Sequence, residues 1–151
     1  MLQAIEDFTT RTEKVGEQMS SSIFLAKKPN GKTSSWNLEL YPKGESTKAN
    51  NHLSIFLKNC DNFPMKAKYK VSILDSSSKK NNTSDSQVQL FDSTKNPIWG
   101  YDKWVVRQSI INNTGLLPGG HFTISCERTV YGTAKILSGS QIVENKSTQQ
   151  P

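Results

Sequence analysis

Two histidines and two cysteines are the side chains best suited to nucleophilic or metal chemistry: His52, His121, Cys60 and Cys126. A catalytic nucleophile needs a base beside it, and a structural zinc ion needs four closely spaced ligands; the sequence shows neither pattern. Both histidines lie beside apolar strand starts, which indicates structural or surface roles. Cys126 falls on the apolar face of its segment, and Asp61 next to Cys60 would not lower a thiol pKa. The sequence therefore predicts no catalytic residue, no metal site and no cofactor, and a protein that is not an enzyme.

Lysines are the next group with a chemical role, in a chain whose formal net charge is +6. Lys66, Lys68 and Lys70 alternate along one segment, and Lys79 and Lys80 follow in a polar run. A row of lysines beside exposed aromatic rings can bind single-stranded nucleic acid. The same row keeps an edge strand soluble, and no nucleic-acid motif accompanies it. Nucleic acid is therefore the less favoured partner, and an acidic peptide is an intermediate hypothesis.

Aromatic side chains that do not fit a buried strand face are the most informative residues. Phe56 lies between two aliphatic residues that alternate toward the core, so we expect it to face outward. Trp99 and Tyr101 share one strand face, and Gly100 between them lets another backbone approach closely. Two interpretations stay open, one in which these residues form an apolar groove and one in which they pack in the core. Tyr69 alternates with aliphatic residues, which favours the core.

Alternation of apolar and polar residues with a period of two is the dominant pattern, and no segment keeps helical spacing for three turns. We expect strands near residues 35–41, 53–57, 69–73, 104–111 and 122–130. Residues 75–86 are a run of Ser, Lys and Asn that suits a surface loop. Many short strands with polar connections indicate an all-β fold, an antiparallel β-sandwich.

The length of 151 residues is that of one domain, and a hydrophobic share of 34% predicts polar loops and a polar end. We expect a folded domain at residues 1–137 and a flexible linker or tail at residues 138–151. The apolar stretches are too short to span a bilayer, and the N-terminus lacks the core of a signal peptide. These patterns predict a protein of the nucleus or cytoplasm with no membrane partner.

Six motifs in a fixed order give the chain a resemblance to a known family. They are residues 36–44 (WNLELYPKG), 52–57 (HLSIFL), 67–74 (AKYKVSIL), 99–101 (WGY), 115–118 (GLLP) and 122–127 (FTISCE). Together they resemble the MATH (meprin and TRAF-C homology) domain, and most closely the substrate-binding domains of the speckle-type POZ (BTB/POZ-MATH) proteins. The resemblance implies an eight-stranded antiparallel β-sandwich of TRAF-C/MATH topology.

The resemblance also implies a function and a site. In speckle-type POZ proteins this domain holds short, extended, Ser/Thr-rich peptide motifs of substrates. The cullin-RING ubiquitin ligase is engaged only through a following BTB/POZ domain, which these residues do not include. The peptide-binding groove of the family corresponds here to Phe56, Tyr69, Trp99 and Tyr101, with Gly100 between the last two. For Tyr69 the resemblance replaces the core position that the alternation favours.

Several polar residues of the family's groove are changed in this chain. Pro97 and Ile98 stand where the family has a lysine and an aspartate before the tryptophan, and Asp102 replaces a lysine after the second aromatic residue. Ile98 and Asp102 are therefore candidates for the groove rim, together with Phe91 from the preceding segment. Gln3 stands where the family has a tryptophan, which predicts a truncated N-terminal strand. We expect the groove to be kept and its polar preference to differ.

Three functions remain, in order of preference. The first is a peptide-binding substrate-recognition module for ubiquitin-dependent degradation. The second is a stand-alone or TRAF-type MATH scaffold that binds receptor or partner peptides without a ligase role, although the first residues show no coiled-coil heptads. The remote alternative is nucleic-acid binding through the lysine-rich face, which predicts an affinity that falls steeply with salt.

Overall fold

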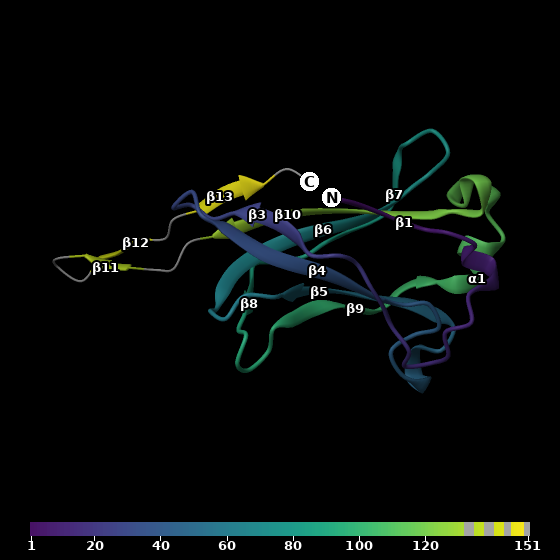
Figure 1. Ribbon diagram of the computed structural model, residues 1–151, viewed down its shortest axis with the longest axis horizontal. Coiled ribbons are helices and arrows are strands. Elements are labelled where there is room, and N and C mark those ends of the chain that lie inside the picture. Colours follow the sequence, from purple (N-terminus) through teal and green to yellow (C-terminus); the bar gives the residue numbers. More distant parts are fainter. Residues whose placement is uncertain (132–134, 138–140, 144–145, 150–151) are drawn as a thin grey trace.

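Two antiparallel sheets packed face to face form the body of the molecule (Figure 1). The computed structural model describes residues 1–131, 135–137, 141–143 and 146–149, and describes side chains up to residue 131. In these residues the chain forms thirteen strands, more than the eight expected, because edge segments of two to four residues are also paired. The all-β sandwich expected from the alternation is confirmed.

The first sheet has β10 and β6 at its centre, paired over nine residues. Its strands in spatial order are β1 (Leu2–Ile5), β10 (Phe122–Tyr131), β6 (Met65–Leu74) and β7 (Lys80–Asp85). β8 (Gln89–Phe91) also pairs with β6, and β13 (Lys146–Gln149) also pairs with β10. The outer edge of this sheet is therefore divided between two short strands, β7 and β8.

The second sheet faces the first across the core. Its strands in spatial order are β2 (Met19–Ser20), β4 (Thr33–Tyr41), β5 (His52–Asn59) and β9 (Ile98–Val106), and β3 (Phe24–Lys27) also pairs with β4. β9 is the edge strand next to β5. Helical turns are short: α1 (Arg107–Ile111) follows β9, and 3-10 turns cover Phe8–Thr10, Thr47–Ala49, Thr114–Leu116 and Pro118–Gly120. In the described residues no helix is long and apolar enough to cross a membrane.

Two expected boundaries are wrong. The strand expected at 104–111 ends at Val106, because the Arg107 amide donates to Asn51 and the chain then turns into α1, closed by a bond from Asn112 N to Gln108 O. The loop expected at 75–86 contains β7, because its polar residues pair with β6 at the exposed edge of the sheet. Polar composition alone does not exclude an edge strand, whose side chains remain in water.

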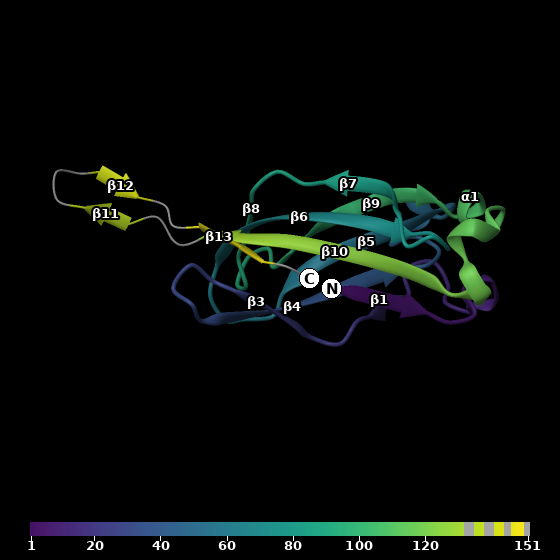
Figure 2. The ribbon, with the colours of Figure 1, turned by 90° about the horizontal axis from the view of Figure 1, so that it is seen from above.

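The segment after β10 was expected to be a linker from residue 138. β11 (Lys135–Leu137) and β12 (Gln141–Val143) pair with each other and lie away from the sandwich (Figure 2). β13 returns to pair with the last four residues of β10. The tail therefore contains paired backbone, while residues 138–140, 144–145 and 150–151 lie outside the described residues. The domain boundary at residue 137 stays a prediction.

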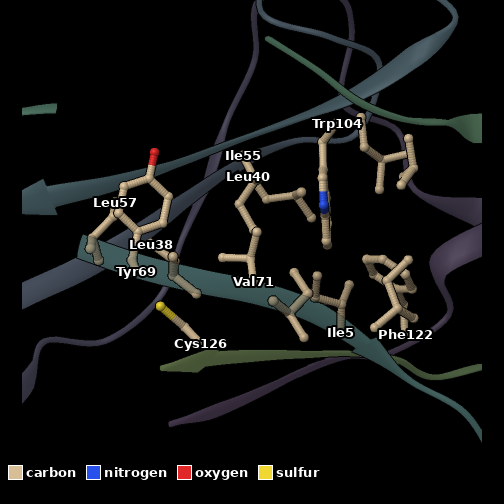
Figure 3. Packing of buried hydrophobic residues seen from close by; sticks show 14 of the residues in the cluster. Ile5, Leu38, Leu40, Ile55, Leu57, Tyr69, Val71, Trp104, Phe122 and Cys126 are labelled. Atoms are coloured by element: carbon tan, nitrogen blue, oxygen red, sulfur yellow. The ribbon is translucent and has the colours of Figure 1, made fainter. Parts of the chain in front are cut away.

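The core lies between the two sheets and is filled by the inward residues of the alternating strands (Figure 3). Trp36, Leu38 and Leu40 of β4 are all buried, as the alternation predicts. The buried indole of Trp36 donates to Ser34 Oγ at 2.8 Å, so its polar group is satisfied. Apolar burial on this scale is the main source of stability for such a sandwich.

Candidate functional site

Phe56 lies on the outer face of the second sheet, as the alternation predicts. Its neighbours in β5, Ile55 and Leu57, point into the core, whereas Phe56 is half-buried and packs edge-on against Tyr41, with ring centroids 5.8 Å apart. Opposite Phe56 in the edge strand is Gly100. A Cβ at Gly100 would overlap the Ile55 carbonyl oxygen and lie 2.8 Å from Phe56 Cδ1. The absence of a side chain at Gly100 therefore allows β9 to lie close to the β5 backbone and to the Phe56 ring.

Trp99 and Tyr101 point to the other face of the same strand. They are opposite Leu57 and Ile55, which are core residues, and both pack partly buried against the core. The Trp99 indole donates to the carbonyl oxygen of Leu90 at 2.8 Å, which links β9 to β8 of the other sheet. Trp99 and Tyr101 therefore close the open side of the sandwich between the edges of the two sheets.

Tyr69 of β6 meets Tyr101 at this open side, with ring centroids 6.0 Å apart. Tyr69 is only 5% exposed, and Figure 3 shows it among the core side chains. Burial raises the pKa of Tyr69 well above its usual value, and burial with the nearby Asp85 carboxylate also raises the pKa of Tyr101. The Tyr101 hydroxyl is buried and has no hydrogen-bond partner of good geometry in the part of the chain that the structure describes, although the Tyr69 phenol lies beside it. Tyr69 is buried, as the alternation predicts. It also contacts Tyr101 at the open side of the sandwich, next to the residues that the resemblance assigns to the groove.

The backbone of β9 is open on one side. Within the described residues, β5 pairs with one side of β9 and no strand pairs with the other. The backbone amide of Asn59 donates to the Pro97 carbonyl at 2.9 Å, which shows which residues of β9 form their backbone hydrogen bonds with β5. Because alternate residues of an antiparallel edge strand bond inward, the amide and carbonyl groups of Ile98 and Gly100 point to the free edge. An extended peptide can pair with such an edge.

The expected groove residues thus fall into two groups separated by β9. Tyr69, Trp99 and Tyr101 lie on the inner side of the strand, and Phe56 with Gly100 lies on the outer side. Phe56 points to the opposite face of the sheet from Trp99 and Tyr101, so the expected aromatic residues lie on both faces of the sheet edge, and their role as a peptide-binding groove stays a prediction. We call the free edge of β9 with these two aromatic groups the β9 site.

The candidate rim residues differ in their positions. Phe91 is 0% exposed and packs against Trp36 with ring centroids 5.0 Å apart, so the expectation of a rim position is wrong. Pairing of β8 with β6 turns its side chain into the core. Ile98 is half-buried and Asp102 is exposed, both in β9 on the face of Gly100. These two residues border the outer part of the β9 site.

The histidines and cysteines have surroundings that fit structural roles. His52 Nδ1 lies 2.7 Å from the Asn51 side-chain oxygen, and His121 is exposed. Cys126 is fully buried, and burial raises the pKa of its thiol to about 11. Burial also raises the pKa of the Cys60 thiol. Within the described residues no three His, Cys, Asp or Glu side chains are grouped as metal ligands.

The lysines of β6 lie on the outer face of the first sheet, as expected from their alternation. Lys70 is 3.8 Å from Asp85 of β7, and Lys80 forms an ion pair with Glu127 of β10. Lys68 is exposed. The row is therefore partly neutralised at its β7 end.

The chain has a two-sheet topology, a fixed order of sequence motifs and aromatic residues on β9, and these features can be compared with those of known families. A family model for the MATH domain matches residues 1–127. The chain belongs to the MATH family. MATH domains are generally protein-interaction modules rather than enzymes, so this domain binds protein partners.

Two residues of this MATH domain's site escaped sequence reasoning. Tyr41 packs against Phe56, but it directly precedes a proline and looked like the end of a strand. Leu90 accepts the Trp99 indole through its carbonyl group, and a backbone acceptor leaves no signal in a sequence. The one signal in the sequence was that Tyr41 is an aromatic residue on the outward face of its strand, where it can contact another outward ring.

Proposed function

We propose that this MATH domain is a peptide-binding substrate-recognition module, and that short extended segments of partner proteins pair with the free edge of β9. The observation that carries the proposal is a strand that has one free edge within the described residues and aromatic side chains beside both of its faces. Backbone pairing would supply hydrogen bonds without regard to sequence, and alternate peptide side chains would contact Phe56 on one face and Trp99 or Tyr101 on the other.

The wider role follows from the resemblance to speckle-type POZ proteins. In a longer protein with a BTB/POZ domain, the module would present substrates to a cullin-RING ubiquitin ligase in the nucleus or cytoplasm. We expect the single site to be weak, with micromolar or higher Kd, because the interface is small. Two linked copies would bind more tightly through effective concentration.

Titration of extended Ser/Thr-rich peptides against the wild-type protein and Trp99→Ala tests the site. We expect binding to weaken about ten-fold or more in the variant, because a large aromatic contact is removed. Thermal unfolding of Trp99→Ala checks that it remains folded. Equal binding by the two proteins would exclude Trp99 from the site.

A second experiment tests strand pairing and does not depend on any protein variant. Peptides that carry a single N-methyl group at successive positions lose one backbone donor each. Because only alternate peptide amides face β9, we expect N-methylation to weaken binding at every second position. Uniform sensitivity, or none, would contradict pairing with the β9 edge.

A further inference from the structure

A second surface lies beside β8, on the outer face of the first sheet. A pocket with a volume of about 370 Å³ is lined there by Lys66, Val88, Gln89, Leu90 and Tyr131. Val88 is 47% exposed and Leu90 is 49% exposed. Exposed apolar side chains that gather in one place mark interaction surfaces more often than single ones do. We call this surface the β8 pocket.

The floor of the β8 pocket is regular sheet. Leu90 is opposite Lys66 in the pairing of β8 with β6, and Lys66 is opposite Tyr131 in the pairing of β6 with β10. The three residues therefore form one row across three strands, with side chains on the same face. A surface fixed by strand pairing keeps its shape when a partner binds, which lowers the entropic cost of binding.

The charges around the β8 pocket are positive. The acidic residues Asp85 and Glu127 pair with lysines at the β7 end of the face, away from the pocket. Lys68 follows Lys66 on the outer face of β6, is exposed, and forms no ion pair within residues 1–131. No carboxylate lines the pocket in the part of the chain that the structure describes.

We propose that the β8 pocket binds an acidic segment of a partner protein, which inserts one aliphatic or aromatic side chain between Val88 and Leu90. Carboxylates beside that anchor face Lys68. The centre of the pocket is a pair of aliphatic side chains, which favours an apolar side chain over stacked bases, because single-stranded nucleic acid is held mainly by aromatic platforms. The apolar pair and Lys68 together therefore select an acidic peptide.

The β8 pocket is connected to the β9 site through one residue. The carbonyl group of Leu90 accepts the Trp99 indole at 2.8 Å, while the Leu90 side chain lines the pocket. A partner with two binding segments would therefore contact adjacent surfaces on one domain. The second contact would benefit from the effective concentration that the first one creates.

The experiment uses a fluorescently labelled peptide, Glu-Asp-Leu-Phe-Asp-Glu, and its fluorescence anisotropy with the wild-type protein at low and physiological salt. We expect Leu90→Asp to weaken binding about ten-fold or more, because it removes the apolar wall and adds a like charge. We expect Lys68→Glu to weaken binding about three-fold or more and to reduce its salt dependence. Both side chains are exposed, so the variants should fold normally.

Matched controls carry the same chemical changes elsewhere. Leu25→Asp changes an exposed leucine of β3 in the other sheet, and Lys48→Glu changes an exposed lysine of a 3-10 turn. Both should bind the peptide within about two-fold of the wild type, since neither residue lines the pocket. An equal loss in Leu25→Asp and Leu90→Asp would overturn the proposal.

Two further measurements separate this proposal from its competitors. Trp99→Ala should keep binding of the acidic peptide within about three-fold, since Trp99 does not line the pocket and its indole bonds to the backbone carbonyl of Leu90 rather than to its side chain. If Trp99→Ala loses the peptide while Leu90→Asp keeps it, the peptide occupies the β9 site and the β8 pocket is not its receptor. If a ten-nucleotide oligothymidine binds more tightly than the peptide and Leu90→Asp has no effect, the face binds nucleic acid and the proposal is wrong.

Discussion

Replacing Gly100 with alanine tests how closely β9 and β5 are packed. The new Cβ would overlap the Ile55 carbonyl oxygen and would lie 2.6 Å from Phe56 Cα and 2.8 Å from Phe56 Cδ1. The first two of these atoms belong to the backbone, so no rotation of a side chain can relieve the contact. β9 would have to move away from β5.

The expected loss of stability combines two effects. Overpacking of a well-packed site costs about 1–3 kcal/mol. Lengthening a neighbouring ladder hydrogen bond adds about 1 kcal/mol. We therefore expect the free energy of unfolding to fall by about 3 kcal/mol, which lowers Tm by about 6–12 °C for a domain of this size.

Urea unfolding followed by tryptophan fluorescence, with thermal unfolding followed by circular dichroism, measures the change. Gly115→Ala is the matched control, because a Cβ there meets only the side-chain oxygen of Asn113 at 3.2 Å. That control should change stability by less than about 1 kcal/mol. If Gly100→Ala is as stable as the wild type to within about 0.5 kcal/mol, our explanation of the glycine is incorrect.

Two further predictions concern buried polar groups. Arg128 is only 4% exposed, donates to the Leu25 carbonyl and lies over the Phe24 ring, but among the described residues its Nε and Nη1 atoms have no hydrogen-bond partner, and burial lowers its pKa. Replacing it with methionine should leave the free energy of unfolding unchanged or raise it by about 1–4 kcal/mol, and a clear loss in urea unfolding would show that the guanidinium stabilises the fold. Burial raises the pKa values of Tyr69 and Tyr101, so the unfolded chain loses these protons first and stability should fall as the pH rises above about 10. Absorbance titration of the phenols should show that Tyr69→Phe removes a late-ionising group, and a titration unchanged by that substitution would argue against its burial.

The alternation of side chains identified much of the fold, because the period of a strand is a local property. It predicted that Trp36 would face the core and that Phe56 would face outward, and both are confirmed. It also indicated that Tyr69 belongs to the core, which its burial supports. The inward face of a strand can be read from a sequence when the neighbouring residues alternate clearly.

The positions of Trp99 and Phe91 depend on pairing between strands that are distant in sequence. Trp99 is opposite Leu57, so it shares the inner face, but nothing in residues 98–101 reveals that register. Phe91 belongs to a three-residue strand, and its pairing with Met65 decides that its side chain points into the core. Strand β7 escaped prediction because its side chains are polar and exposed at an edge. Register and edge pairing are non-local, and one sequence carries little information about them.

The division of the first sheet's outer edge into β7 and β8 bears on the solubility of the protein. Each strand is short, at six and three residues, so neither offers a long template for an unfolded neighbour. The second sheet ends in β9, which is nine residues long and carries the charged pair Asp102 and Lys103 near its middle. Charges on an edge strand discourage uncontrolled stacking of copies. In the proposed function, resistance to aggregation and peptide binding depend on the same strand, and substitutions that make β9 more apolar would favour self-association at high concentration.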